Sequence, residues 1–409
     1  MSSGLDPAFR EHGGRVVSAL AAAFRDLDLA EDAFADACAR AAETWEAAPP
    51  TDPAAWLYAV ARRRALDRLR RRATASSHRP DDPAPAPTPE DHLMALNEPI
   101  PDERLRLIFV CCHPAIAPDA RAALTLKTVC GLSVAEIAQA FLTSEPTLAQ
   151  RLVRAKRKIA QAGVPYEVPG PDRWPERMDA VLSTLEVAYA QAHADAALAG
   201  PHADFAREVL TLTTLLARLA PDDAEVLALA ATVRLTEARR PARLAPDGAM
   251  RPLSDQDVRD WDTALLVEGE RLLAQSASLS RKRERPPGPR AIQAAIHAAH
   301  ASRHVTGRTP WRAILELYDI LLSWRDDPVV RVNRAVALAE VEGPAAALLA
   351  LDAASTPGWL PFHAARADLL ARLGRGTEAV NDYDLALALS PSPAEALFLN
   401  RRRAVSVAV

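Results

Sequence analysis

The sequence is short of glycine, cysteine and lysine, and these shortages narrow the classes of protein to consider. Only 15 of its 409 residues are glycine, whereas alanine is abundant in almost every segment. Because alanine has the highest helix propensity, this balance favours helices over glycine-dependent sheets. Four cysteines, none of them in a Cys-x-x-Cys pair, do not form a disulfide framework in a chain of this length. We therefore expect an all-α protein in a reducing compartment, the cytoplasm.

Long hydrophobic runs are also missing. No apolar run reaches the roughly 18 residues that a membrane helix needs, and Met1–Arg15 lacks the apolar core of a signal peptide. We expect no membrane partner.

The basic residues are almost all arginine, 45 Arg against 4 Lys, and the formal net charge is −4. This charge excludes a uniformly basic nucleic-acid binder but permits local basic patches.

Proline divides the chain into parts. Pro80–Pro101 contains seven prolines and five acidic residues but no lysine or arginine, which is typical of an extended linker. A softer break lies at Val164–Arg173, where three prolines and a glycine interrupt helical sequence. We therefore predict four parts: a first domain at 1–79, the acidic linker at 80–101, a second domain at 102–168 and a helical extension at 169–409.

Two short segments concentrate the positive charge. Ala61–Arg72 has seven arginines and one aspartate, and Arg151–Lys158 has five basic residues and no acid. Both segments lie in expected helices, so each would present a positive stripe. An isolated stripe is usually a solvated helix face. Two stripes on either side of an acidic linker favour contact with DNA.

Residues 118–161 have the pattern of a helix-turn-helix. A first helix is expected at 118–129, and Gly131 ends it. A capping box, Ser133-Val-Ala-Glu136, begins a second helix at 134–141, and Ser144 caps a third with Pro146 in its first turn. The third helix has apolar residues at i, i+4, i+7 and i+11, which predicts a buried stripe of Leu148, Leu152, Ala155 and Ile159.

The opposite face of this third helix is polar and basic. In a helix-turn-helix, the N-terminal part of the second helix of the motif meets base edges in the major groove. Gln150 can pair with adenine and Arg154 with guanine, whereas basic side chains further along suit phosphates. The predicted DNA-contacting residues are Thr147, Gln150, Arg151, Arg154, Arg157 and Lys158. The alternative is a solvated helical hairpin without a DNA role.

Several motifs together resemble bacterial sigma factors of the extracytoplasmic-function type. Gly131-Leu-Ser-Val-Ala-Glu-Ile-Ala and Glu145-Pro-Thr-Leu-Ala-Gln-Arg-Leu-Val-Arg-Ala-Lys resemble region 4, and Leu29-Ala-Glu-Asp-Ala-Phe-Ala-Asp-Ala and the segment 55–71 resemble region 2. The chain is most similar to the group with a long tetratricopeptide-like C-terminal extension, through segments such as Leu105-Arg-Leu-Ile-Phe-Val-Cys-Cys-His-Pro and Asp255-Gln-Asp-Val-Arg-Asp-Trp.

The resemblance implies two small helical sigma domains, a Pro-rich linker and a helical solenoid, with core RNA polymerase and promoter DNA as partners. It implies that the third helix of 118–161 reads the −35 element. The first domain would read the −10 element with Trp56, Arg63, Asp67, Arg70 and Arg71, although Trp56 is favoured as a core residue over a stacking platform. Glu31, Asp32 and Asp36 would contact the polymerase, and the linker would lie in the polymerase channel or serve as a spacer.

The sequence departs from the family pattern in two places. Ala35 precedes Asp36 where these proteins often have glutamine, and Ala190-Gln191-Ala192-His193 stands where the group usually has Asn-Glu-Gly-Tyr.

In the extension, Arg372–Pro391 fits the second half of a tetratricopeptide unit, with Gly374, Ala379, Tyr383, Ala386 and Pro391 in the expected positions. Ala347 and Ala354 lie 32 residues before Ala379 and Ala386, as a repeat would require.

Other features carry weaker signals. His297, His300 and His304 share a helix face, but without nearby acidic or cysteine ligands they favour ordinary histidines over a metal site. Cys111 and Cys112 are adjacent and so point in different directions on a helix, which favours buried thiols. Ser280–Arg290 is a basic loop, solvated or in contact with DNA or polymerase.

Three functional hypotheses follow. The first is a sigma factor whose C-terminal repeats regulate it through an intramolecular or protein partner. The second is a helix-turn-helix activator with a tetratricopeptide sensor, which would not need the Ala61–Arg72 helix. The third is an α-helical enzyme in the extension. The sequence has no phosphate loop, nucleophile elbow or recognisable catalytic carboxylate pair, so we expect no catalytic residue, metal or cofactor.

Overall fold

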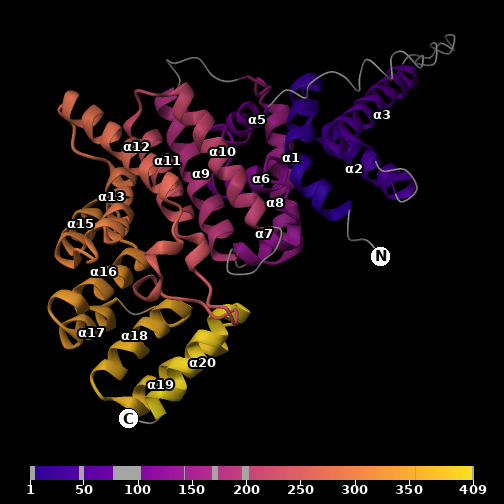
Figure 1. Ribbon diagram of the computed structural model, residues 1–409. Coiled ribbons are helices and arrows are strands. Elements are labelled where there is room, and N and C mark those ends of the chain that lie inside the picture. The colour runs from indigo at the N-terminus through magenta and orange to yellow at the C-terminus, as the bar shows by residue number, and fades with distance from the viewer. Residues whose placement is uncertain are drawn as a thin grey trace. The chain divides into compact units, whose positions relative to one another are not determined.

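The computed structural model describes residues 5–45, 50–76, 103–141, 143–167, 174–195, 202–354 and 356–407. Its regular structure over these residues is helical (Figure 1), with one isolated bridge between Leu244 and Met250 and no strand. The expected all-α fold is confirmed. The helices form two compact units, Met1–Gln191 and Ala192–Val409. The predicted linker at 80–101 lies outside the described residues.

The first unit begins with three helices that pack on one another, α1 (Leu5–Phe24), α2 (Leu27–Thr44) and α3 (Pro53–Ser76). They are at the indigo end of the chain in Figure 1. Asp26 caps α2 by accepting a hydrogen bond from the Leu29 amide at 2.9 Å, and Asp52 does the same for α3. Small residues let these helices approach closely, because the buried side of α2 is largely alanine: Ala30, Ala33, Ala37 and Ala41.

Four further helices complete the helix-turn-helix region of the first unit: α5 (Arg104–Cys111), α6 (Pro118–Thr128), α7 (Val134–Ala140) and α8 (Glu145–Gln161). Gly131 adopts a positive φ of 69° just after α6, as expected of a helix-ending glycine. Helix α1 packs on α5 and α6. Gly14 makes this approach possible, because a Cβ atom there would overlap the carbonyl oxygen of Val129.

Helix α9 (Trp174–Asp195) connects the first unit to the sequence that follows. Arg177 donates a hydrogen bond to the Phe109 carbonyl oxygen, and the Cys112 thiol donates one to Thr184 Oγ1 at 3.3 Å. The compact units therefore divide at Gln191, whereas the change in sequence composition lies at 168–169. Cys111 and Cys112 are fully buried, and burial raises the pKa of Cys111 to about 12. The preference for buried thiols is confirmed.

The second unit is a succession of helices, most of which pack mainly on their neighbours in the sequence. Short 3₁₀ turns at Arg240–Ala242, Leu253–Asp255 and Val258–Asp260 lie between α11 and α12. The α-helices are α10 (His202–Leu219), α11 (Ala224–Glu237), α12 (Thr263–Lys282), α13 (Pro289–Ala301), α14 (Arg303–Thr306), α15 (Trp311–Trp324), α16 (Pro328–Val341), α17 (Pro344–Ala353), α18 (Leu360–Arg372), α19 (Gly376–Ala388) and α20 (Pro393–Val407).

The segment predicted to be repeat-like forms the pair α18 and α19. Gly374 has a φ of 72° in the turn between them. Ala379, Tyr383 and Ala386 are buried on α19, and Ala347 is buried on α17. A buried network links the pair, because Asp382 accepts a hydrogen bond from His363 Nδ1 at 2.8 Å and another from Arg366. The contact between α18 and α19 thus combines this network with the small and aromatic side chains of Ala379, Tyr383 and Ala386.

Candidate nucleic-acid interface

The N-terminus of α8 has the helix cap that its sequence predicts. Ser144 is in an extended conformation and its Oγ accepts a hydrogen bond from the Thr147 amide, while Pro146 lies in the first turn. The predicted buried stripe is confirmed: the buried residues of α8 are Leu148, Leu152, Ala155 and Ile159. These side chains hold α8 against α6 and α7. The rotation of α8 about its axis is thereby fixed.

The opposite face of α8 brings the predicted DNA-contacting residues together. Arg154 Nη2 lies 3.4 Å from Gln150 Oε1, one turn apart on the helix. Arg151 is half-buried at the edge of this face. The exposed members are Thr147, Gln150, Arg154, Arg157 and Lys158. This face can offer an amide and a guanidinium to base edges, with cations beside them for phosphates.

A second basic face lies on α3. Its exposed side chains are Arg62, Arg63, Arg64, Arg70, Arg71 and Arg72. Asp67, which is half-buried, lies 3.6 Å from Arg70. Trp56 is also half-buried and packs edge-on against Trp45, with ring centroids 5.4 Å apart and planes at 71°. Trp56 therefore contributes to packing and retains an exposed part.

The acidic residues of α2 are paired with cations of the same unit. Arg68 on α3 bonds Asp32 at 2.5 Å and Asp36 at 2.8 Å. The hydrogen bond that Arg68 donates to Asp36 is the main reason why the pKa of Arg68 is raised. The basic helix and the acidic helix thus neutralise each other in part, which charge counted along the sequence does not reveal.

Lys156 connects α8 to α2. Its Nζ lies 2.5 Å from Glu31 and 3.1 Å from Asp28. Burial acts to lower the pKa of Lys156, but the two carboxylates outweigh it and the pKa is raised. Sequence reasoning missed both Lys156 and Arg68 as partners of the acidic residues. Lys156 follows the buried Ala155, at the border of the apolar stripe, and this border position was the available signal.

Comparison with known proteins identifies the two helical groups of the first unit. Residues 8–74 match the family model of Sigma-70 region 2, and residues 106–159 match that of Sigma-70 region 4. The chain belongs to the RNA polymerase sigma factors. Region 2 covers α1 to α3, and region 4 covers α5 to α8.

The two other matches are to a family of unknown function and to an uncharacterized protein. Residues 177–277 match a family of unknown function (DUF6596). An uncharacterized protein of Rhizobium meliloti is 37% identical over 396 residues, which is 94% of this chain and 92% of that protein. No solved structure matches the chain.

The two sigma-factor regions establish the general function of the chain. A sigma factor directs core RNA polymerase to promoters, so core polymerase and promoter DNA are its partners. The chemistry of RNA synthesis belongs to the polymerase, and the sigma regions are those of a non-enzymatic transcription factor. Over the described residues, no helix is long and apolar enough to cross a bilayer.

The histidines of the second unit are engaged in packing and hydrogen bonding. His297 Nδ1 lies 3.0 Å from Arg239 Nη2, and burial together with this cation lowers the pKa of His297. His300 packs edge-on against Trp311, and burial lowers its pKa to about 4. His304 Nδ1 lies 3.3 Å from the Val258 carbonyl oxygen. No group of three or more candidate ligands for a metal ion occurs in the described parts of the chain.

Proposed function

We propose that this sigma factor is of the extracytoplasmic-function type and recognises promoters with α8 and α3. The observation that carries the proposal is the exposed face of α8, where Gln150 and Arg154 lie together opposite a fully buried stripe. Gln150 and Arg154 read base edges of the −35 element. Thr147, Arg151, Arg157 and Lys158 contact the backbone beside them and position the helix without reading sequence.

Helix α3 contacts the −10 element in this proposal. Capture of unpaired bases needs cations for the backbone and an aromatic or planar group for stacking. Arg63, Arg70 and Arg71 supply the cations, Trp56 supplies the ring, and Asp67 accepts hydrogen bonds from bases. The exposure of the three arginines and the partial exposure of Trp56 support this assignment.

The remaining parts complete the assignment. Glu31, Asp32 and Asp36 bind core polymerase, the segment 80–101 connects the two promoter-reading regions, and the protein acts in the cytoplasm. The helical extension regulates the first unit as a tetratricopeptide-like repeat domain. Packing of successive helices through small buried residues, such as Ala347 and Ala379, supports a repeat architecture.

Transcription reconstituted from core polymerase and the purified protein tests the proposal. Because no other sigma factor is present, promoter-specific transcripts identify a sigma factor, whereas an activator gives none. Arg154→Ala should weaken use of a −35-dependent promoter by about 1–3 kcal/mol, the value of one bidentate base contact. Arg40→Ala is the matched control, because Arg40 is exposed and bound to Glu43 on α2. Equal loss in both variants would reject α8 as the reader.

A further inference from the structure

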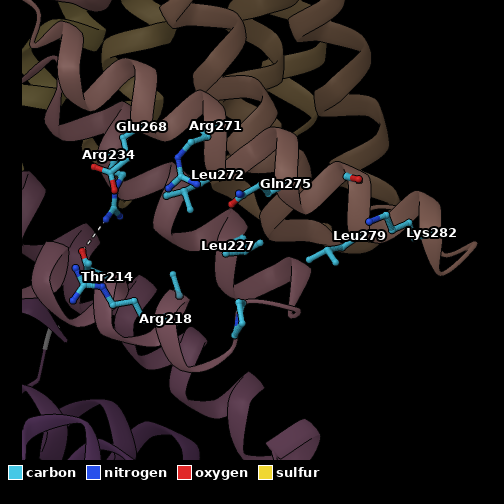
Figure 2. A pocket seen from close by; sticks show the side chains of 13 residues that line it. Thr214, Arg218, Leu227, Arg234, Glu268, Arg271, Leu272, Gln275, Leu279 and Lys282 are labelled. Carbon is cyan, nitrogen blue, oxygen red and sulfur yellow. Dashed lines mark hydrogen bonds and ion pairs between the residues drawn. The ribbon is translucent and has the colours of Figure 1, made fainter.

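A groove lies in the second unit between α10 and α12, with α11 beneath it (Figure 2). It encloses about 520 Å³, within the usual range of ligand sites. Its residues on α12 recur over four turns, from Glu268 to Lys282, so none of the described helices of the unit covers this face of α12. At about 1.5 Å per residue, the groove follows α12 for roughly 21 Å.

The groove combines an apolar floor with one buried cation. Leu227 and Leu272 form this floor and are themselves nearly buried, at 3% and 4% exposed, and Leu279 is half-buried beside them. Arg234 is only 3% exposed, and its guanidinium donates to Thr214 Oγ1 at 2.7 Å and lies 2.9 Å from Glu268. Figure 2 shows Arg234 between these two residues. The charge of Arg234 is therefore matched within the protein.

Three other cations of the groove are not matched. Arg218, Arg271 and Lys282 are exposed, and none has an acidic partner or hydrogen-bond acceptor among the described residues. Elsewhere in the same unit, arginines on helix faces form ion pairs, for example Arg334 with Asp319 and Arg403 with Asp384. With Glu268 balancing Arg234, the groove retains an excess of three positive charges.

The spacing of these cations indicates the shape of the ligand. Arg271 and Lys282 are 11 residues apart on α12, which is roughly 16 Å along the helix. One phosphate or carboxylate cannot bridge that distance. Among the described residues that line the groove, none is an aromatic residue on which a base could stack. An elongated ligand with several negative charges and apolar side chains matches this surface.

We propose that the groove binds an acidic, leucine-rich peptide segment of a partner protein. Carboxylates of the segment pair with Arg218, Arg271 and Lys282, while its apolar side chains contact Leu227, Leu272 and Leu279. This is a recognition function of the second unit, separate from the promoter-reading helices. It holds independently of how the first unit reads DNA.

Fluorescence anisotropy with the full-length protein tests this proposal. The probe is a labelled peptide of about eight residues that alternates glutamate and leucine, long enough for the groove at about 3.3 Å per residue. The same peptide with glutamine in place of glutamate should bind about tenfold more weakly or not at all. Added salt should lower the affinity of the protein for the glutamate peptide.

Paired variants locate the binding. Arg271→Glu with Lys282→Glu should reduce affinity for the glutamate peptide about tenfold or more, because both cations become repulsive. Arg308→Glu with Arg312→Glu is the control, since these arginines are exposed and lie outside the groove. Thermal unfolding of both double variants checks that each is folded.

Several outcomes would overturn the proposal. One is equal binding of the glutamate and glutamine peptides, and another is equal binding by the groove and control variants. Complete displacement of the peptide by inorganic pyrophosphate would instead indicate a small-anion site. Preferential binding of single-stranded DNA through the same residues would assign the groove to nucleic acid.

Discussion

Gly14 lies where α1 approaches the end of α6, and a side-chain methyl group there would disrupt this packing. A Cβ atom there would overlap the Val129 carbonyl oxygen, so Gly14→Ala forces α1 away from the end of α6. We expect the variant to lower the free energy of unfolding by about 1–3 kcal/mol, as overpacking does. Gly358→Ala is the matched control, because nothing lies near the added atom and its φ is not positive. Urea unfolding of the two variants measures the difference, and equal midpoints would contradict this account.

His300 makes stability depend on pH. Burial lowers its pKa to about 4 from an ordinary value of 6.5, and Arg239 and Arg303 contribute. Below pH 6.5 the unfolded chain therefore binds the proton more readily than the folded one, so stability falls as the pH drops from 6.5 to 4. His300→Phe keeps the ring against Trp311 and should reduce this loss by about 1–3 kcal/mol. Thermal unfolding at pH 7 and pH 5 should show a smaller difference in the variant than in the wild type.

Helices α8 and α2 share a contact that involves a proposed polymerase-binding residue. Lys156 is bound to Glu31 and Asp28. If Glu31 contacts the polymerase, that interaction competes with Lys156. We expect Lys156→Ala to raise affinity for core polymerase by a few fold, since one such pair is worth about 1 kcal/mol. Lys158→Ala on the exposed face is the control. Lower affinity of Lys156→Ala in a core-binding titration would mean that the contact only supports folding.

Local sequence patterns predicted the cap and the buried face of α8, but they did not predict its contacts with other helices. The cap at Ser144 and the stripe from Leu148 to Ile159 depend on residues close in the sequence, and both are present. Arg68 and Lys156 find their partners more than 30 residues away, on α2, so helical periodicity does not specify them. The same limit applies to Gly14, whose importance comes from Val129 on another element. Residue roles at the −35 and −10 elements stay predictions.

Helix α9 determines where the chain can be divided into fragments that fold. Arg177 and Thr184 bond Phe109 and Cys112, so a protein ending at residue 173 loses partners of the region 4 core. A protein of residues 1–195 keeps them. We expect the longer fragment to unfold cooperatively with the higher midpoint, because the shorter one leaves the Phe109 carbonyl and Cys112 without these partners, at about 1–3 kcal/mol each. Guanidinium unfolding of both fragments makes the comparison.

The same fragment isolates the role of the second unit. If the helical extension regulates the sigma regions, residues 1–195 and the full chain should differ in promoter-specific transcription at equal saturation of core polymerase, because only the full chain carries the regulator. The direction of the change gives the sign of regulation. The groove variant Arg271→Glu with Lys282→Glu provides the companion measurement, since it alters the second unit without removing it. Equal transcription by fragment, variant and full chain would show that promoter use does not depend on the second unit.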